Sequence, residues 1–177
     1  MNTNEQIKIT PKVGALTGAI IGFIVGAIFV FTGCNFSTQS SISVTNKEIT
    51  IEIPSDYVET NEADKDFSYA NGKFAISGDT HTSSDFMGIG MEVKDAEQYA
   101  KFLMDLNPQF KFSELEEKDD YLYFTFGGIV NDVSRSKIAG VFEHNNTFYF
   151  ISVECETVNE HLLEDVFFDV MDTIEYN

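Results

Sequence analysis

The sequence predicts an α+β domain in which a mainly antiparallel sheet is covered by helices on both faces, an α/β/α sandwich. Between residues 47 and 177, short apolar strands are joined by hairpin turns, which makes the sheet mainly antiparallel. Two amphipathic helices interrupt the strands, and two of the strands are apolar on both faces. Because a strand that is buried on both faces needs cover on both sides, we expect helices on each face. One apolar N-terminal helix precedes the domain.

The first strands follow from alternation and turn residues. Residues 49–53 alternate between isoleucine and polar side chains, as a half-buried strand does, and a proline ends them. Residues 67–70 and 73–77 flank the dipeptide Asn71-Gly72, which is typical of a two-residue hairpin turn. We therefore expect a strand followed by a hairpin.

The first helix of the domain has clear start and stop signals. It is expected over residues 96–106, where Asp95 and Gln98 form a capping box and Pro108 follows the end. Its apolar stripe consists of Tyr99, Phe102, Leu103 and Leu106. Residues 87–93, after a polar loop, indicate another short strand before this helix.

The C-terminal part predicts four strands and a closing helix. The strands are expected over residues 110–116, 121–126, 137–143 and 147–154. The last of them is apolar on both sides, with Tyr149, Ile151, Val153 and Cys155 pointing one way and Phe148 and Phe150 the other. The closing helix, over residues 158–174, starts at a capping box of Thr157 and Glu160.

Composition excludes nucleic-acid binding. The 177 residues carry 29 acids and 11 bases, a net charge of −18, and Arg135 is the only arginine. A protein of this charge is repelled by phosphate backbones and favours partners that carry positive charge. The apolar content of 43%, with 17 phenylalanines, is enough for a well-filled core.

An uncharged apolar segment at residues 13–33 predicts a membrane anchor. As a helix, the twenty residues without charge at 13–32 span roughly 30 Å, which matches the hydrocarbon core of a bilayer. Basic residues precede it, at Lys8 and Lys12, so residues 1–12 are expected in the cytoplasm. Residues 34–46 then form a polar tether to an extracytoplasmic domain at residues 47–177.

Two versions of the anchor remain open. In the first, the helix stays in the membrane, and one of its faces is made of small residues four apart, at Gly14, Gly18, Gly22 and Gly26. Small residues at that spacing let two membrane helices pack closely. In the second, the segment is a signal peptide ending at a sequence, Val-Phe-Thr-Gly-Cys, that resembles a bacterial lipobox. Cys34 would then carry the lipid that anchors the protein.

The candidate metal ligands lie in one polar loop. Asp79, His81 and Asp85 offer carboxylate and imidazole groups, which metal ions accept as ligands. The same pattern is typical of a solvated surface loop, and no nucleophile motif accompanies it. Acidic clusters at residues 59–66 and 114–120 indicate weak calcium binding as an alternative to plain solvated faces. No cofactor is expected.

The order of motifs resembles the PsbP-like family. An opening ITIEIPSDY is followed by hairpins, a central YAKFLMDL helix, then YLYFTFGG and KIAGVFEHNNTFYFISVE, and a closing amphipathic helix. The resemblance covers roughly residues 47–176. It implies an α/β/α sandwich that is not an enzyme and serves as an accessory or binding module, and it carries over no catalytic residue.

Together these observations predict a membrane-anchored, non-catalytic binding or accessory domain on the outer face of a bacterial cell. Its expected partners are the membrane and an unidentified envelope or membrane protein. One alternative is a metal-dependent hydrolase centred on the loop from Asp79 to Asp85. Another is a small subunit of a membrane complex that docks through the glycine face of its N-terminal helix.

Overall fold

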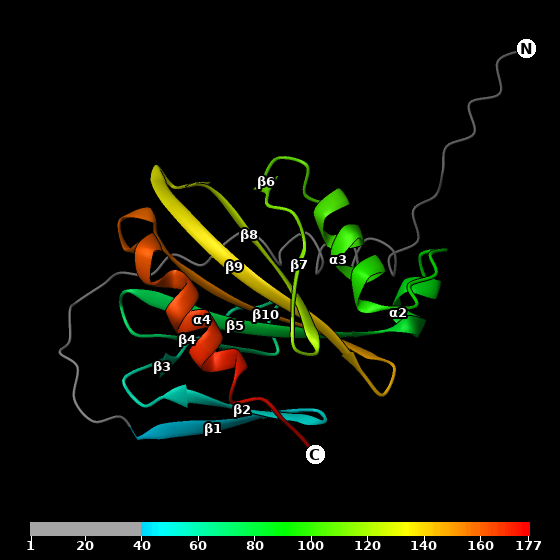
Figure 1. The fold of residues 1–177 in the computed structure, drawn as a ribbon, viewed down its shortest axis with the longest axis horizontal. Coiled ribbons are helices and arrows are strands. Elements are labelled where there is room, and N and C mark those ends of the chain that lie inside the picture. The colour runs from blue at the N-terminus through cyan, green and yellow to red at the C-terminus, as the bar shows by residue number, and fades with distance from the viewer. Residues whose placement is uncertain (1–39) are drawn as a thin grey trace, which may run out of the picture.

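Two antiparallel sheets form the frame of the protein (Figure 1). The structure is a computed structural model that describes residues 40–177. The smaller sheet has the order β1-β2-β11, with bounds Ser41–Asn46, Ile49–Pro54 and Glu175–Tyr176. The larger sheet has the order β3-β4-β5-β10-β9-β8-β6, and β7 also pairs with β8. Its strands are β3 (Val58–Glu59), β4 (Phe67–Ala70), β5 (Phe74–Thr82), β6 (Lys111–Phe112), β7 (Glu116–Lys118), β8 (Tyr121–Val130), β9 (Val133–His144) and β10 (Thr147–Glu156).

Helices are few in the described part of the chain. They are α2 (Ser83–Met87), α3 (Ala96–Asp105) and α4 (Leu163–Met171), with a 3-10 helix at Thr157–Leu162 leading into α4. The predicted cap of α3 is confirmed, because the backbone N–H of Gln98 donates to the Asp95 carboxylate at 2.8 Å. Within residues 40–177, no helix has the length and apolar character needed to cross a bilayer. The apolar helix predicted at residues 13–33 lies outside the described residues.

The central strand β10 is buried on both faces, as the alternation of its side chains predicts. One apolar cluster contains Tyr149, Ile151, Val153 and Cys155, together with residues of β2 and α4. A second cluster contains Phe148 and Phe150, together with residues of α2 and α3. The mainly antiparallel sheet is therefore confirmed, and its strongest apolar strand lies at its centre.

The cover of the large sheet differs from the predicted layers of helices. On the side of the first cluster, Ile49, Ile51 and Ile53 of β2 pack against the large sheet together with α4. A second small sheet therefore covers much of the face that helices were expected to cover. On the other side, α3 and the short α2 contribute Phe86, Tyr99 and Phe102. The physical requirement is only that both faces be covered, and a sheet satisfies it as well as a helix does.

The strand predicted over residues 87–93 is wrong, because a short helix occupies its start. The N–H and hydroxyl of Thr82 both donate to the Asp85 carboxylate, at 2.7 and 2.8 Å, which caps α2. This places Phe86 in the core, fully buried. In the stretch that follows α2, glycines separate the alternating apolar residues, and only Val93 is buried.

Several strands begin or end at other residues than the sequence predicts. β1 lies within the stretch assigned to the polar tether, and it pairs with β2 along its whole length. The single strand expected over residues 110–116 is divided into β6 and β7. β8 and β9 extend until only Asn131 and Asp132 connect them, both with positive φ (50° and 65°), as a tight hairpin turn requires.

Candidate binding pocket

A pocket opens where the β7–β8 turn, the end of α4 and β11 meet. Lys118 and Tyr121 pair across the turn, and Asp119 and Asp120 form its tip. Asp119 has a φ of 54°, a left-handed conformation that aspartate tolerates better than most residues. The turn therefore presents two adjacent carboxylates at one edge of the sheet.

The opposite wall comes from the C-terminal end of the chain. After α4 the chain returns along β2 as β11, and Thr173 holds this return in place. The Thr173 hydroxyl donates to the Val170 carbonyl at 2.7 Å, and the Glu52 N–H donates to the same hydroxyl at 3.0 Å. These bonds tie the end of α4 to the small sheet and so fix the side chains that follow it.

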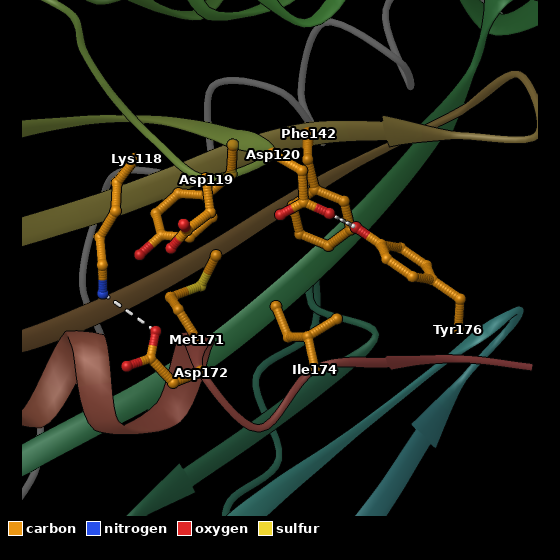
Figure 2. A pocket seen from close by; sticks show the side chains of 9 residues that line it. Lys118, Asp119, Asp120, Phe142, Met171, Asp172, Ile174 and Tyr176 are labelled. Carbon is orange, nitrogen blue, oxygen red and sulfur yellow. Dashed lines mark hydrogen bonds and ion pairs between the residues drawn. The ribbon is translucent and has the colours of Figure 1, made fainter.

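The pocket has a volume of about 340 Å³. Its lining residues are Lys118, Asp119, Asp120, Tyr121, Phe142, Met171, Asp172, Ile174 and Tyr176. Figure 2 shows Lys118 and Asp172 at one end and Tyr176 at the other, with Met171 and Ile174 between them. The pocket thus combines apolar walls with a rim of carboxylates.

Two interactions hold the ends of the pocket. The Lys118 ammonium donates to Asp172 at 2.9 Å and lies 4.3 Å from the centre of the Phe168 ring. The Tyr176 hydroxyl donates to the Asp120 carboxylate at 2.6 Å (Figure 2). Burial, followed by this hydrogen bond, raises the pKa of Tyr176, so the phenol stays protonated and remains a donor.

Two polar groups of the pocket stay without a good partner among residues 40–177. The Tyr121 side chain is only 5% exposed, and its hydroxyl makes no hydrogen bond of normal geometry, although the Lys118 ammonium lies close to it. Burial raises the pKa of Tyr121, and the nearby Lys118 ammonium partly offsets this. The Asp119 carboxylate has no hydrogen-bond or ion-pair partner in this part of the chain.

The predicted metal ligands do not line this pocket. They lie at the end of β5 and in α2, and all three have hydrogen-bond partners, with Asp79 accepting the Thr80 N–H at 3.0 Å. His81 is 5% exposed, and its Nδ1 shares a hydrogen bond of 2.9 Å with the Tyr99 hydroxyl. Burial lowers the pKa of His81. Asp85 caps α2, as described above. The described residues contain no group of three His, Cys, Asp or Glu side chains placed to hold a metal ion. The metal site stays a prediction that metal analysis of the protein would test.

The remaining predicted site residues fall outside the described part of the chain. Cys34 and the glycine face at Gly14, Gly18, Gly22 and Gly26 all precede residue 40. The other cysteine, Cys155, is buried in the first apolar cluster, as predicted, and burial raises the pKa of its thiol to about 12.

The pocket residues were missed in the sequence. The Asp119-Asp120 dipeptide indicated a turn and the end of an acidic cluster, without a pocket, and Tyr176 followed the expected end of the closing helix. In the pocket, Lys118 pairs with Asp172 and Asp120 pairs with Tyr176, and the two partners are 54 and 56 residues apart along the chain. The only local signal was a pair of adjacent acids in a hairpin turn.

Comparison with known proteins identifies the fold. No family model and no curated protein matches the sequence. The structure is similar to the Ran-binding protein Mog1p of Saccharomyces cerevisiae, with a TM-score of 0.55 and 10% identity over 78% of this chain and 96% of that one. It is also similar to the cyanobacterial PsbP (CyanoP) of Synechocystis, with a TM-score of 0.54 and 13% identity over 86% of this chain and 100% of that one. The described domain therefore has the fold shared by PsbP and Mog1p, and the PsbP-like resemblance is confirmed at the level of the fold.

Proposed function

We propose that this chain is a non-catalytic binding or accessory domain, held by its N-terminal segment at the outer face of a bacterial membrane. The observation that carries the binding role is the pocket beside the β7–β8 turn. Its lining combines apolar side chains with carboxylates and the buried Tyr121 hydroxyl, so it offers a ligand both apolar contact and polar groups that fix its orientation.

The fold supports a binding role. Mog1p, which has a similar fold, is a Ran-binding protein, so this architecture serves as a protein-binding domain in at least one other setting. The polar loop that suggested a hydrolase supports catalysis less well. Two of its side chains, His81 and Asp85, are hydrogen-bonded to Tyr99 and Thr82, where they stabilise the core and a helix start.

The anchor rests on the sequence. Residues 13–32 are uncharged and long enough to span a bilayer, and the first strand of the domain begins at Ser41. The domain would therefore lie close to the membrane surface. Its strongly negative charge suits an exported domain that must stay soluble beside the membrane.

Protease treatment of cells tests this placement. We expect the full chain, expressed in a bacterial host, to fractionate with membranes, and protease added to spheroplasts to digest residues 40–177 while a cytoplasmic marker stays intact. A chain lacking residues 1–33 should lose its membrane association. A domain that resists protease until the cells are lysed would contradict the extracytoplasmic placement.

The two alternatives make different predictions. A hydrolase centred on the Asp79 loop requires a metal that purifies with the protein and is lost in Asp79→Asn. A subunit that docks through its helix requires co-purifying membrane proteins that are lost when Gly18 and Gly22 are replaced by leucine. Retention of the same partners in that double variant would eliminate docking through the glycine face.

A further inference from the structure

We infer that the pocket between the β7–β8 turn, α4 and β11 binds an alkylammonium or guanidinium group with an apolar stem, such as the end of a lysine or arginine side chain. The inference rests on the proposed binding function and names the ligand class of that site. Three features of the pocket carry it: its charge, its aromatic walls and its buried phenol.

The charge of the pocket selects a cation. Three aspartates and one lysine line it, and the lysine is already paired with Asp172. Of the other two carboxylates, Asp120 accepts the Tyr176 hydroxyl, and Asp119 has no partner among residues 40–177. An anionic ligand would be repelled by this set. A cation between Asp119 and Asp120 would gain two charge-assisted hydrogen bonds.

The walls select an apolar stem next to the charge. Phe142 and Tyr176 lie edge to face, with ring centres 6.2 Å apart, and Phe142 also stacks on Tyr149 at 4.9 Å. Tyr176 also stacks on the His144 ring, with ring centres 4.3 Å apart. Ring faces attract ammonium and guanidinium groups, and rings that are already packed lose little entropy when a ligand binds.

The Tyr121 hydroxyl supplies an acceptor inside the pocket. It is buried without a hydrogen bond of normal geometry, which is costly for the free protein, and the Lys118 ammonium beside it is already bound to Asp172. A ligand N–H that donates to this oxygen would remove that cost. Tyr121 is thus the group whose environment in the free protein is incomplete, and it points to a donor ligand.

A titration of the full chain in detergent, at 150 mM KCl, tests the inference. The probes are butylamine, spermidine and an acetylated, amidated Gly-Lys-Gly tripeptide. We expect saturable binding that is weakened at least about tenfold by Asp119→Asn and by Tyr121→Phe, since each removes one hydrogen bond to a charged group. Asp105→Asn, which removes the same charge at the far end of α3, should leave the affinity unchanged.

The comparison of probes identifies the source of the ligand. Tighter binding of the tripeptide than of the two amines supports a basic side chain of a partner protein, and tighter binding of spermidine supports a free polyamine. Both results support the pocket. Calcium chloride is titrated as a separate arm, because hard cations also bind carboxylates.

Three results would overturn the inference. Equal losses in Asp119→Asn and Asp105→Asn would mean that the amine is attracted by the net charge alone. Calcium binding that displaces the amine and is lost in Asp119→Asn would make the pocket a metal site. If the folded wild-type protein binds none of the amines, the proposed ligand class is wrong. That last result leaves the membrane placement standing, because the protease experiment tests it separately.

Discussion

The only arginine of the chain is buried in an ion pair. Arg135 on β9 donates to Glu154 on β10 at 2.5 Å, and Lys137 contacts the second oxygen of the same carboxylate. The Arg135 and Glu154 side chains are 7% and 6% exposed. Removing one member of such a group leaves the others charged and without compensation in a medium that solvates them poorly.

We predict that Glu154→Gln lowers the free energy of unfolding by roughly 3–5 kcal/mol, because two cations then remain buried without their partner. Urea denaturation measures the change. The matched control is Glu92→Gln, whose pair with Lys94 is mostly exposed (74% and 62%) and should contribute nearly nothing. Similar losses of unfolding free energy in the two variants would show that the buried ion pairs contribute no more to stability than an exposed pair does.

A second prediction concerns the pH dependence of stability. Burial raises the pKa of Asp79 from its ordinary value of 3.8 to about 7, and burial lowers the pKa of Lys65 to about 8. The folded state therefore holds the Asp79 proton more tightly than the unfolded state does. Its contribution to stability is complete below about pH 4 and is lost as the pH rises towards 7.

The Asp79→Asn variant should lose this part of the pH dependence, since it has no proton to release. The free energy of unfolding, measured between pH 4 and pH 7, should decline less steeply than in the wild type. The Lys65 ammonium stays charged over most of this range and contributes little to the slope. Asp105→Asn is the control and should keep the steeper decline. An unchanged slope in Asp79→Asn would contradict the raised pKa.

At the scale of elements, α4 lies on the large sheet because a strand residue without a side chain makes room for it. A Cβ atom added at Gly140 of β9 would lie 2.7 Å from the Met171 methyl group and 3.0 Å from the Phe167 ring. The close approach lets Phe167 reach Tyr121 and become fully buried. The position of α4 in turn places Met171 and Asp172 at the pocket.

We predict that Gly140→Ala destabilises the protein by about 1–3 kcal/mol, because the added methyl group overpacks the contact between β9 and α4. It should also weaken amine binding, since Met171 has to move. Gly88→Ala is the control: its added Cβ meets only two backbone oxygens, at 3.4 and 3.8 Å, so the stability of this variant should not fall. A Gly140→Ala protein as stable as the wild type would mean that the helix adjusts freely.

Local signals predicted some elements and missed others of equal strength. The Asp95 cap correctly predicted the start of α3. The Thr82–Asp85 capping box also starts a helix, but it lies in a stretch interpreted as a metal-binding or solvated loop. β10 was predicted together with the direction of its side chains, because alternation reports both. β11 has two residues and no pattern of its own, so only its pairing with β2 defines it.

At the scale of the whole molecule, whether Cys34 is lipidated decides which parts of the chain are present in the mature protein and can bind a partner. If Cys34 is lipidated, the glycine-faced helix is removed with the signal peptide and the domain alone carries the function. If it is not, the helix remains and offers a second surface for binding. The two cysteines of the chain give this question an internal control, because Cys155 is buried and its thiol has a raised pKa.

We predict that the full chain incorporates a labelled fatty acid in a bacterial host and that Cys34→Ala abolishes the label. Cys155→Ala should leave the label unchanged, since a buried protonated thiol is a poor nucleophile. The readout is the label on the purified chain. A wild-type chain without label would contradict lipidation and favour the retained helix.

The sequence by itself determined the antiparallel sheet, the two-faced central strand and the capped helix α3, and it predicts a membrane anchor before the described residues. Each of these depends on interactions between residues close together in the chain, so its signal is local. Only the tertiary structure decided the second small sheet, the position of α4 and the pocket, where Lys118 meets Asp172 and Asp120 meets Tyr176 across 54 and 56 residues. The physical reason is that which sheet edges and helix ends meet is set by the packing of the whole domain, and no short stretch of sequence encodes it.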